Sequence, residues 1–242
     1  MAPSLSPNAW LRWDVVKRRL PEVGAHSRTL EVGAGRGSIG ARLAARGPYI
    51  GVEPDVESRR AAGDAIGSAG SIVGHLDEVE PVAFDLLCSF EVLEHIEDDL
   101  GALRSWVERL EPCAHVIVSV PAHRKRFSHQ DVRVGHHRRY DPTDLEQLLA
   151  DAGLSDVHVE PYGFPLGYVL EAVRNRMAAR ELATASDTDR AELTAESGRY
   201  HQPPAWSGVV VQLGTLPFRL LQRAARRTNL GPGLIGTGRV PS

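Results

Sequence analysis

Residues 28–55 contain the feature that most constrains the fold, a short apolar stretch followed by closely spaced glycines. The segment reads RTLEVGAGRGSIGARLAARGPYIGVEPD. This pattern predicts a strand, a glycine-rich turn, a helix and a second strand near residues 49–52, because glycines permit a tight turn and a close approach of the backbone to a ligand. A unit of this kind joins two parallel strands of one sheet.

The alternation of strands and helices continues along the chain. The periodicity and the helix stop signals predict further elements. The helices are expected over residues 56–66, 97–110 and 142–153, and the strands at 71–74, 84–90, 114–120, 156–161 and within 231–242. The stretch AHVIVSV at 114–120 is continuously apolar, as expected of a strand that is covered on both faces. The chain therefore predicts an α/β fold with a doubly wound, mostly parallel sheet.

The pattern divides the chain into four segments. Residues 1–24 are expected to form an N-terminal cap helix, 25–165 the core, 166–230 a helical insertion or lid, and 231–242 the last strand of the core. Within the insertion, residues 182–204 are polar and poor in large apolar side chains, which predicts a mobile insertion or lid. The stretch 206–227 suggests a lid or a homodimer contact more than a membrane-surface helix, because Gly214 and Pro217 interrupt its period.

The composition excludes several classes of protein. With 42% hydrophobic and 24% charged residues among 242, the chain is expected to be globular, and a formal charge of -3 argues against general polyanion binding. No apolar run reaches the roughly 18 residues of a spanning helix, and the first residues do not resemble a signal peptide. Cys88 and Cys113 lie in apolar contexts and are expected to be buried thiols. These features favour a cytoplasmic protein.

Two acidic residues accompany the glycine-rich turn. Glu31 lies in the first strand, and Glu53 ends the second strand. An acid at the second position can accept hydrogen bonds from both ribose hydroxyls of a nucleoside. Residues 35–40 also fit the GxGxxG pattern of dinucleotide-binding proteins. The pattern therefore predicts a cofactor that contains a nucleoside, and it leaves open whether that cofactor is a dinucleotide.

Three segments in order, LEVGAGRG, GVEPD and FDLLCSFEVLEHI, resemble the class I S-adenosylmethionine-dependent methyltransferases over about residues 28–165. The resemblance implies a Rossmann-like seven-stranded sheet with an antiparallel last strand, and S-adenosylmethionine as cofactor. The residues that it implies for cofactor binding are Glu31, Gly33, Ala34, Gly35, Gly37, Glu53, Pro54, Leu76, Asp77, Ser89 and Phe90.

The segment EVLEHIED carries a second cluster. Glu91, Glu94 and His95 are spaced i, i+3 and i+4, so one helical turn would place them on one face, where two carboxylates and an imidazole could bind a divalent cation. Alternatively, the Glu-His pair only orients the turn. The pattern E-x-x-E-H followed by a loop histidine resembles small-RNA 2′-O-methyltransferases, and its first part resembles ubiquinone-pathway O-methyltransferases. That resemblance implies a Mg²⁺ or Mn²⁺ site at Glu91, Glu94, His95 and His136.

The loop 121–142 holds four histidines and six Lys or Arg residues against two Asp residues. Because it follows the fifth expected strand, it lies on the ligand-binding edge of the sheet. It could bind a phosphate or carboxylate group of a substrate, bind RNA, or be only a solvated basic loop. Few aromatic residues are available for base stacking, which makes nucleic acid the weaker alternative. His136, His129 and Asp131 are the candidate catalytic residues.

Together these features predict methyl transfer from S-adenosylmethionine to a hydroxyl group of a small molecule, such as a natural product or a sugar, with help from a divalent metal. A metal-independent N- or O-methyltransferase, an RNA methyltransferase and a non-catalytic S-adenosylmethionine-binding protein are the alternatives.

Overall fold

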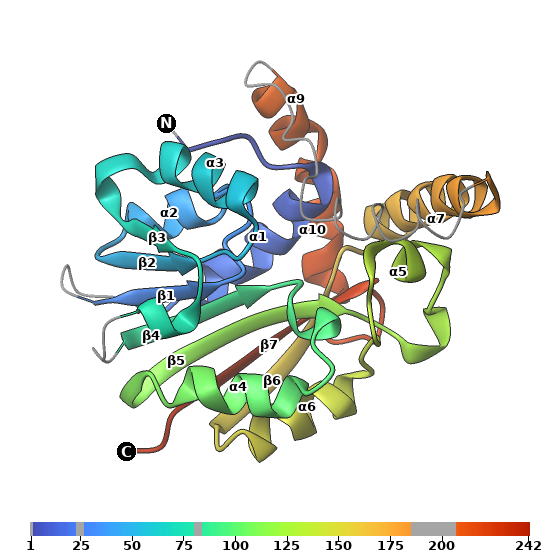
Figure 1. Cartoon of the computed structure of the whole chain (residues 1–242). Helices are drawn as coiled ribbons and strands as arrows, with labels where there is room; N and C mark the ends of the chain where they lie inside the picture. Colours follow the sequence, from blue (N-terminus) through green and yellow to red (C-terminus); the bar gives the residue numbers. More distant parts are fainter. Residues whose placement is uncertain (1, 23–26, 80–83, 185–206) are drawn as a thin grey trace.

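The computed structural model describes residues 2–22, 27–79, 84–184 and 207–242, and it forms a three-layer α/β sandwich (Figure 1). Seven strands form the central sheet in the order β3-β2-β1-β4-β5-β7-β6. Their bounds are β1 Thr29–Val32, β2 Tyr49–Val52, β3 Ser71–Val73, β4 Phe84–Phe90, β5 Leu110–Pro121, β6 Ser155–Tyr162 and β7 Gly233–Arg239. Only β7 is antiparallel to its neighbours, β5 and β6. The predicted fold class is therefore confirmed.

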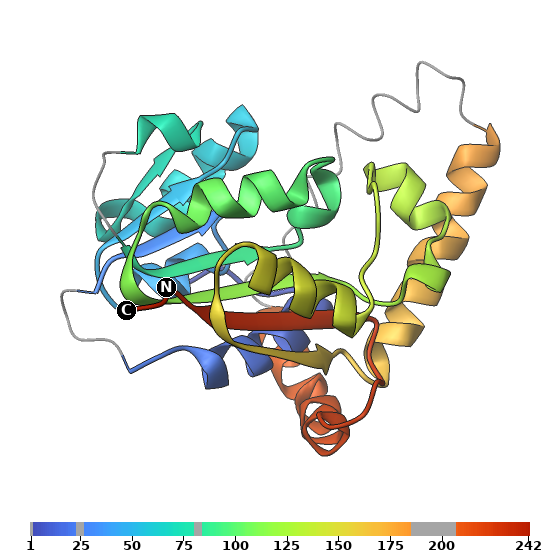
Figure 2. The same ribbon diagram turned by 90° about the horizontal axis from the view of Figure 1, so that it is seen from below.

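Helices cover both faces of the sheet, as Figures 1 and 2 show. The helices α1 (Pro7–Arg19), α2 (Gly40–Ala44) and α3 (Val56–Ile66) pack on one face, and α4 (Asp99–Val107) and α6 (Pro142–Asp151) pack on the other. The strands at the centre are buried on both sides, which is why their sequences are continuously apolar. Short 3-10 turns lie at Gly67–Ala69, Leu76–Glu78, Leu93–His95 and Arg124–Arg126.

The N-terminal helix α1 has a capping residue at its start and a proline after its end. The Ser6 hydroxyl accepts a hydrogen bond from the Ala9 amide, Pro7 opens the first turn, and the helix stops before Pro21. Its apolar face, which includes Leu11 and Val15, is fully buried against the sheet. This packing brings the start of the chain to the carboxyl ends of the strands.

The segment between β6 and β7 forms helices that pack beside the core. They are α7 (Leu166–Thr184), α9 (Ser207–Gly214) and α10 (Leu216–Ala225), and a short helix α5 (His129–Val134) between β5 and α6 packs against α7. The helix break predicted from Gly214 and Pro217 falls between α9 and α10. The predicted mobile segment 182–204 lies mostly outside the described residues, and the four-segment division of the chain stays a prediction.

Helix α10 is joined to α1 by a buried carboxylate. Asp14 accepts hydrogen bonds from Arg223 at 2.5 and 3.0 Å, and Gln222 donates to Asp14 at 3.3 Å and to the Leu11 carbonyl at 2.9 Å. Burial opposes ionisation of Asp14, but the hydrogen bonds and charge of Arg223 outweigh it and lower the pKa of Asp14.

The two cysteines differ in their surroundings. Cys88 in β4 is buried, as predicted, but Cys113 is exposed. The prediction for Cys113 was wrong because this residue lies at the protruding start of β5, where the backbone adopts a left-handed conformation with φ of 64°. Among the described residues, the structure contains no helix with the length and apolar character needed to cross a membrane.

Removing the Asp14 carboxylate should weaken the contact between α1 and α10. We expect Asp14→Ala to lower the free energy of unfolding at pH 7 by about 1–3 kcal/mol, because several hydrogen bonds to a charged group are lost. The lowered pKa of Asp14 means that its contribution is present above the ordinary aspartate pKa and is lost as the pH falls through the folded-state value. Urea unfolding of both proteins at pH 7 and in acid measures this difference.

Asp64, which is exposed on α3, provides the control. Asp64→Ala should leave the free energy of unfolding almost unchanged. An equal effect of the two substitutions at pH 7 would contradict the structural role of Asp14.

Candidate functional site

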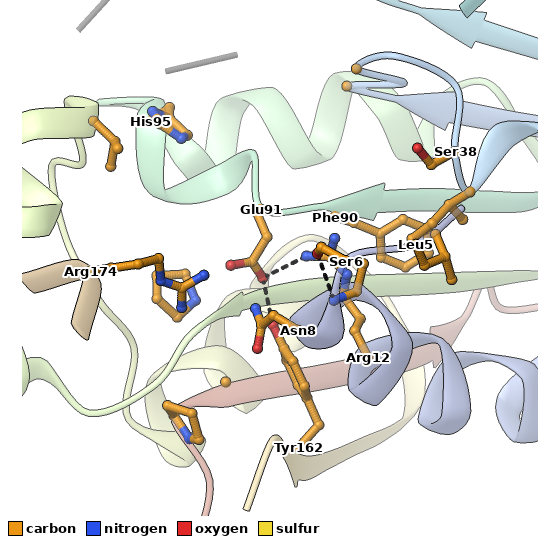
Figure 3. A pocket seen from close by; sticks show the side chains of 18 of the residues that line it. Leu5, Ser6, Asn8, Arg12, Ser38, Phe90, Glu91, His95, Tyr162 and Arg174 are labelled. Atoms are coloured by element: carbon orange, nitrogen blue, oxygen red, sulfur yellow. Dashed lines mark hydrogen bonds and ion pairs between the residues drawn. The ribbon is translucent and has the colours of Figure 1, made fainter. Parts of the chain in front are cut away.

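A cavity of about 510 Å³ lies at the carboxyl ends of β1, β4 and β5. The glycine-rich turn forms one end, and α5 and α7 form the opposite end. The N-terminal segment from Ser4 to Arg12 covers it (Figure 3). This edge of a doubly wound sheet is where ligands bind, because the backbone groups at the ends of the strands are free there. The glycine-rich turn, the end of β4 and the loop after β5 were expected at this edge, whereas α1, α7 and the end of β6 were not.

The three glycines after β1 have different roles, although all have positive φ values of 53–79°. A side chain at Gly33 would clash with Val92, and one at Gly37 would clash with the backbone of Ala62. At Gly35 a side chain would meet no protein atom within 4 Å. Gly33 and Gly37 therefore permit tight packing, whereas the open space at Gly35 lets the backbone face a ligand.

Glu53 at the end of β2 shapes the same turn. Its carboxylate accepts a hydrogen bond from the Gly35 amide at 2.7 Å and another from the Asp55 amide at 2.9 Å. Each carboxylate oxygen has further lone pairs, so Glu53 can still accept hydrogen bonds from ligand hydroxyls. Burial raises the pKa of Glu53, although the two amides oppose this change.

Glu31 lies almost fully buried at the base of the turn and lines the cavity. The Tyr49 hydroxyl donates a hydrogen bond to it at 2.5 Å. Burial raises the pKa of Glu31 to about 8, even though the Tyr49 hydroxyl acts in the opposite direction. In the cofactor-free protein this carboxyl group is therefore mostly protonated at pH 7.

The structure brings only part of the predicted cofactor set to the cavity. The predicted residues that line it are Glu31, Gly33, Ala34, Gly35 and Phe90. The predicted residues outside its lining are Gly37, Glu53, Pro54, Leu76, Asp77 and Ser89. Leu76 and Asp77 lie in the 3-10 turn after β3, and Asp77 is exposed. Ser89 is buried beneath the cavity, and its hydroxyl has no partner within the described part of the chain.

Glu91 does not share a helical face with Glu94 and His95. The 3-10 turn begins only at Leu93, and Glu91 has a left-handed backbone with φ of 59°, so its side chain turns toward α1. There it accepts hydrogen bonds from Ser119 at 2.9 Å and Tyr162 at 3.1 Å. A strained backbone at a residue other than glycine is typical of functional sites.

Arg12 from α1 forms an ion pair with Glu91 at 3.3 Å. Figure 3 shows Arg12 and Tyr162 converging on the Glu91 carboxylate. Burial favours the neutral acid, but the Arg12 charge and the Ser119 hydrogen bond outweigh it and lower the pKa of Glu91. Glu91 is therefore a carboxylate whose charge is balanced inside the protein.

Glu94, His95 and His136 do come together. Their potential metal-binding atoms all lie within 4.8 Å of one another. Glu94 is fully buried, and both of its carboxylate oxygens are without a hydrogen-bond partner among the described residues. Burial raises the pKa of Glu94 well above its usual range, and the Glu91 charge adds to this effect. Burial also lowers the pKa of His95 to about 4, so His95 is neutral at pH 7.

Asp131 holds His136 in a defined orientation. The Nδ1–H group of His136 donates to Asp131 Oδ1 at 2.8 Å, which leaves the lone pair of Nε2 facing Glu94 Oε1 at 3.8 Å. Asp131 also accepts hydrogen bonds from Ser128 and Arg139, and these bonds together lower its pKa despite burial. A carboxylate behind a histidine is the usual arrangement around metal-binding histidines.

The predicted catalytic residues separate into two groups. Asp131 and His136 line the cavity, whereas His129 is exposed on the first turn of α5 and lies outside the lining. The arginines next to His136 bind protein groups: Arg138 bonds to Asp99 and the Glu97 carbonyl, and Arg139 bonds to Asp131 and Glu171. The part of the loop around Arg138 and Arg139 is therefore held by ion pairs within the protein, whereas Arg124 and Lys125 are exposed.

Four residues of the site were missed by the sequence analysis: Arg12, Ser119, Tyr162 and Arg174. Ser119, a serine within an apolar strand, carries no local signal of function. Arg12 and Arg174 belong to helices outside the core, and only the tertiary structure brings them to the cavity. The end of the β6 strand pattern could have indicated Tyr162, since strand ends line this edge of the sheet.

Three solved structures that are similar to this chain share its fold. Phosphoethanolamine N-methyltransferase 2 of Haemonchus contortus, in complex with S-adenosyl-L-methionine, has a TM-score of 0.61 at 16% identity, and the match covers 96% of this chain but only 53% of that one. The chain thus spans about half the length of that enzyme. S-adenosylmethionine-dependent methyltransferases of Thermotoga maritima and Archaeoglobus fulgidus have TM-scores of 0.58 and 0.56 at 16% and 14% identity. These matches cover 96% and 93% of this chain, and 89% and 91% of the other two.

The sheet order, the glycine-rich turn and the acid after β2 define the class of protein as a Rossmann-like fold, which this chain shares with the three methyltransferases. The family described as "Methyltransferase domain" matches residues 8–159, which is more than half of the chain. The chain therefore belongs to this family. A search of curated proteins found no match.

The raised pKa of Glu31 gives a test of cofactor binding. We propose that Glu31 binds the cationic amino group of the cofactor, which requires the ionised carboxylate. Because the pKa of Glu31 is about 8, we expect the Kd for S-adenosylhomocysteine to fall as the pH rises from 6 to 8, by up to about tenfold per pH unit. Isothermal titration calorimetry at several pH values measures it.

Glu31→Gln is the matched control, because its amide oxygen can still accept the hydrogen bond from Tyr49. This variant should bind more weakly at pH 8 and lose most of the pH dependence. If the Kd for S-adenosylhomocysteine depended on pH equally in the parent and in the variant, the proposed role of Glu31 would be contradicted.

Proposed function

We propose that the chain transfers the methyl group of S-adenosylmethionine to a hydroxyl oxygen of a small molecule, with a divalent cation, Mg²⁺ or Mn²⁺, held by Glu94, His95 and His136. The observation that carries the proposal is the Glu94 carboxylate, which is fully buried and has no hydrogen-bond partner among the described residues, yet lies beside two imidazoles. A buried carboxyl group without a partner is costly, and a cation would satisfy it.

The donor set fits such a cation. A carboxylate and two neutral imidazoles are suitable ligands for divalent metals, and the Asp131 carboxylate fixes the ring of His136. When bound, a divalent cation lowers the pKa of a coordinated hydroxyl group and so favours attack by oxygen. We assign Glu91, which the sequence also suggested as a ligand, to the Arg12 ion pair instead.

The chain's own residues supply the remaining requirements of methyl transfer, namely orientation and exclusion of water. The N-terminal segment covers the cavity, and α5 and α7 close its acceptor end. A fixed arrangement of donor and acceptor makes a large contribution to a displacement reaction of this type. Ser119, Tyr162 and Arg12 hold the Glu91 carboxylate at the boundary between the cofactor end and the acceptor end.

The ion pairs of the basic loop support a small acceptor rather than RNA. Arg126, Arg138 and Arg139 are each bound to protein carboxylates and are therefore not free to neutralise phosphates. RNA binding without sequence preference depends on such free cations and on exposed aromatic platforms.

Metal binding can be tested without an acceptor. We expect the protein to bind Mn²⁺ in the presence of S-adenosylhomocysteine, and Glu94→Gln and His136→Ala to weaken binding by at least about tenfold, since each removes one ligand. The decrease of the electron paramagnetic resonance signal of free Mn²⁺ measures binding. His129→Ala, at an exposed histidine seven residues from His136, is the control and should bind normally. Equal binding by all three variants and the parent would refute the site.

The acceptor class requires a separate measurement. Methyl-labelled S-adenosylmethionine is incubated with matched pairs of small alcohols, phenols and amines, with Mg²⁺ or with EDTA. We expect label on oxygen, and at least about a hundredfold lower rate in EDTA, because the hydroxyl loses its activation. Label transferred to amines at the same rate in EDTA would favour the metal-independent alternative.

A further inference from the structure

The acceptor end of the cavity contains an arginine that has no partner among the described residues. Arg174 extends from α7 into the cavity, and it is half-buried (Figure 3). Among the described residues, no hydrogen bond or ion pair is formed by its guanidinium group. We propose that Arg174 binds an anionic group, a carboxylate or a phosphate, of the methyl acceptor. This proposal rests on the methyl-transfer function proposed above, and it adds the charge of the substrate.

The charges around Arg174 do not balance. Three guanidinium groups, those of Arg126, Arg139 and Arg174, face two carboxylates, Asp131 and Glu171. Both oxygens of Glu171, one turn before Arg174, are already taken by Arg126 and Arg139. Among the described residues, both of these carboxylates are therefore already paired, and neither is left to neutralise Arg174. A partly desolvated guanidinium favours a bound carboxylate or phosphate, with which it can form two parallel hydrogen bonds.

Helix α7 is held firmly, so Arg174 is in a fixed position. Arg133 of α5 binds Glu181 at 2.5 Å, and the amide of Gln130 donates to Asn175 at 3.3 Å. Glu171, before Arg174 in the sequence, binds the segments on either side of α5 through Arg126 and Arg139, so α7 is held on both sides of Arg174. A cation fixed before binding loses little conformational entropy when the ligand arrives.

A second polar side chain lines the same cavity without a partner. Asn8 of α1 lies beside Tyr162 and Glu91 in Figure 3, and the described structure shows no hydrogen bond from its side chain. Its amide NH₂ group can donate to an anion that Arg174 binds. Asn8 and Arg174 belong to different helices, α1 and α7, and both line the cavity, so we include the Asn8 amide in the proposed site for a small anionic group.

Anion binding can be measured without knowing the acceptor. Inorganic phosphate and acetate are titrated separately into the S-adenosylhomocysteine-loaded protein in EDTA and low salt, and binding is followed by phosphorus and proton nuclear magnetic resonance. We expect one of the two anions to bind, and Arg174→Gln to weaken it at least about tenfold, since a charge-assisted hydrogen bond is lost. Asn8→Asp, which adds a negative charge, should have a similar effect. Preference for phosphate or for acetate identifies the class of anion.

Arg176→Gln is the matched control, because Arg176 is exposed on the same helix and lies outside the cavity lining. It should bind the anion as the parent does, and all variants should keep the Kd for S-adenosylhomocysteine. Absence of anion binding by the parent, or equal binding by Arg174→Gln, would overturn the proposal. A loss of S-adenosylhomocysteine affinity alone would overturn it too, by assigning Arg174 to the cofactor. EDTA is present in all of these titrations, so they do not involve the metal. A negative result would therefore contradict the anion site without contradicting the proposed metal site or the proposed methyl transfer.

Discussion

The buried carboxylate of Asp131 is the interaction on which the acceptor end of the cavity depends. It accepts hydrogen bonds from Ser128, His136 and Arg139, so it closes the first turn of α5 and fixes the ring of His136. Arg139 then binds Glu171 and so connects the loop to α7. A single acid thus holds three elements that are separate in the sequence. Such a network is strong when its charged members are paired, and here Asp131, Arg139 and Glu171 all have partners of opposite charge.

The fold could be predicted because its signals are local. Helix α3 begins and ends where its capping residue Asp55 and the following Gly67 indicate, and β7 coincides with the glycine-containing apolar stretch at the end of the chain. The glycine-rich turn and Glu53 were recognisable for the same reason, since a strand, a turn and an acid lie within one short segment. Each of these features needs only its neighbours in the sequence to be interpreted.

The candidate site could be predicted only in part, because its geometry depends on tertiary contacts. The spacing of Glu91, Glu94 and His95 would place them together only if a helix began at Glu91. Instead, Val92 packs onto the open face of Gly33, and the chain enters a 3-10 turn with Glu91 in a left-handed conformation. The partner of Glu91 is Arg12, almost 80 residues earlier in the chain. No local pattern indicates which of two nearby carboxylates will find an arginine.

The polar groups of the site fall into two sets. Those that are paired within the protein hold the cavity walls together, and those without a pair are available to bind a ligand. Glu91, Asp131 and Glu171 each have cationic partners within the protein, and they connect its walls. Glu94 has no hydrogen-bond partner, and Arg174 has no hydrogen bond or ion pair, among the described residues. An acid and a base that the protein leaves in this state are each available to a ligand of their own. A cation at Glu94 and an anionic group of the acceptor at Arg174 would satisfy both.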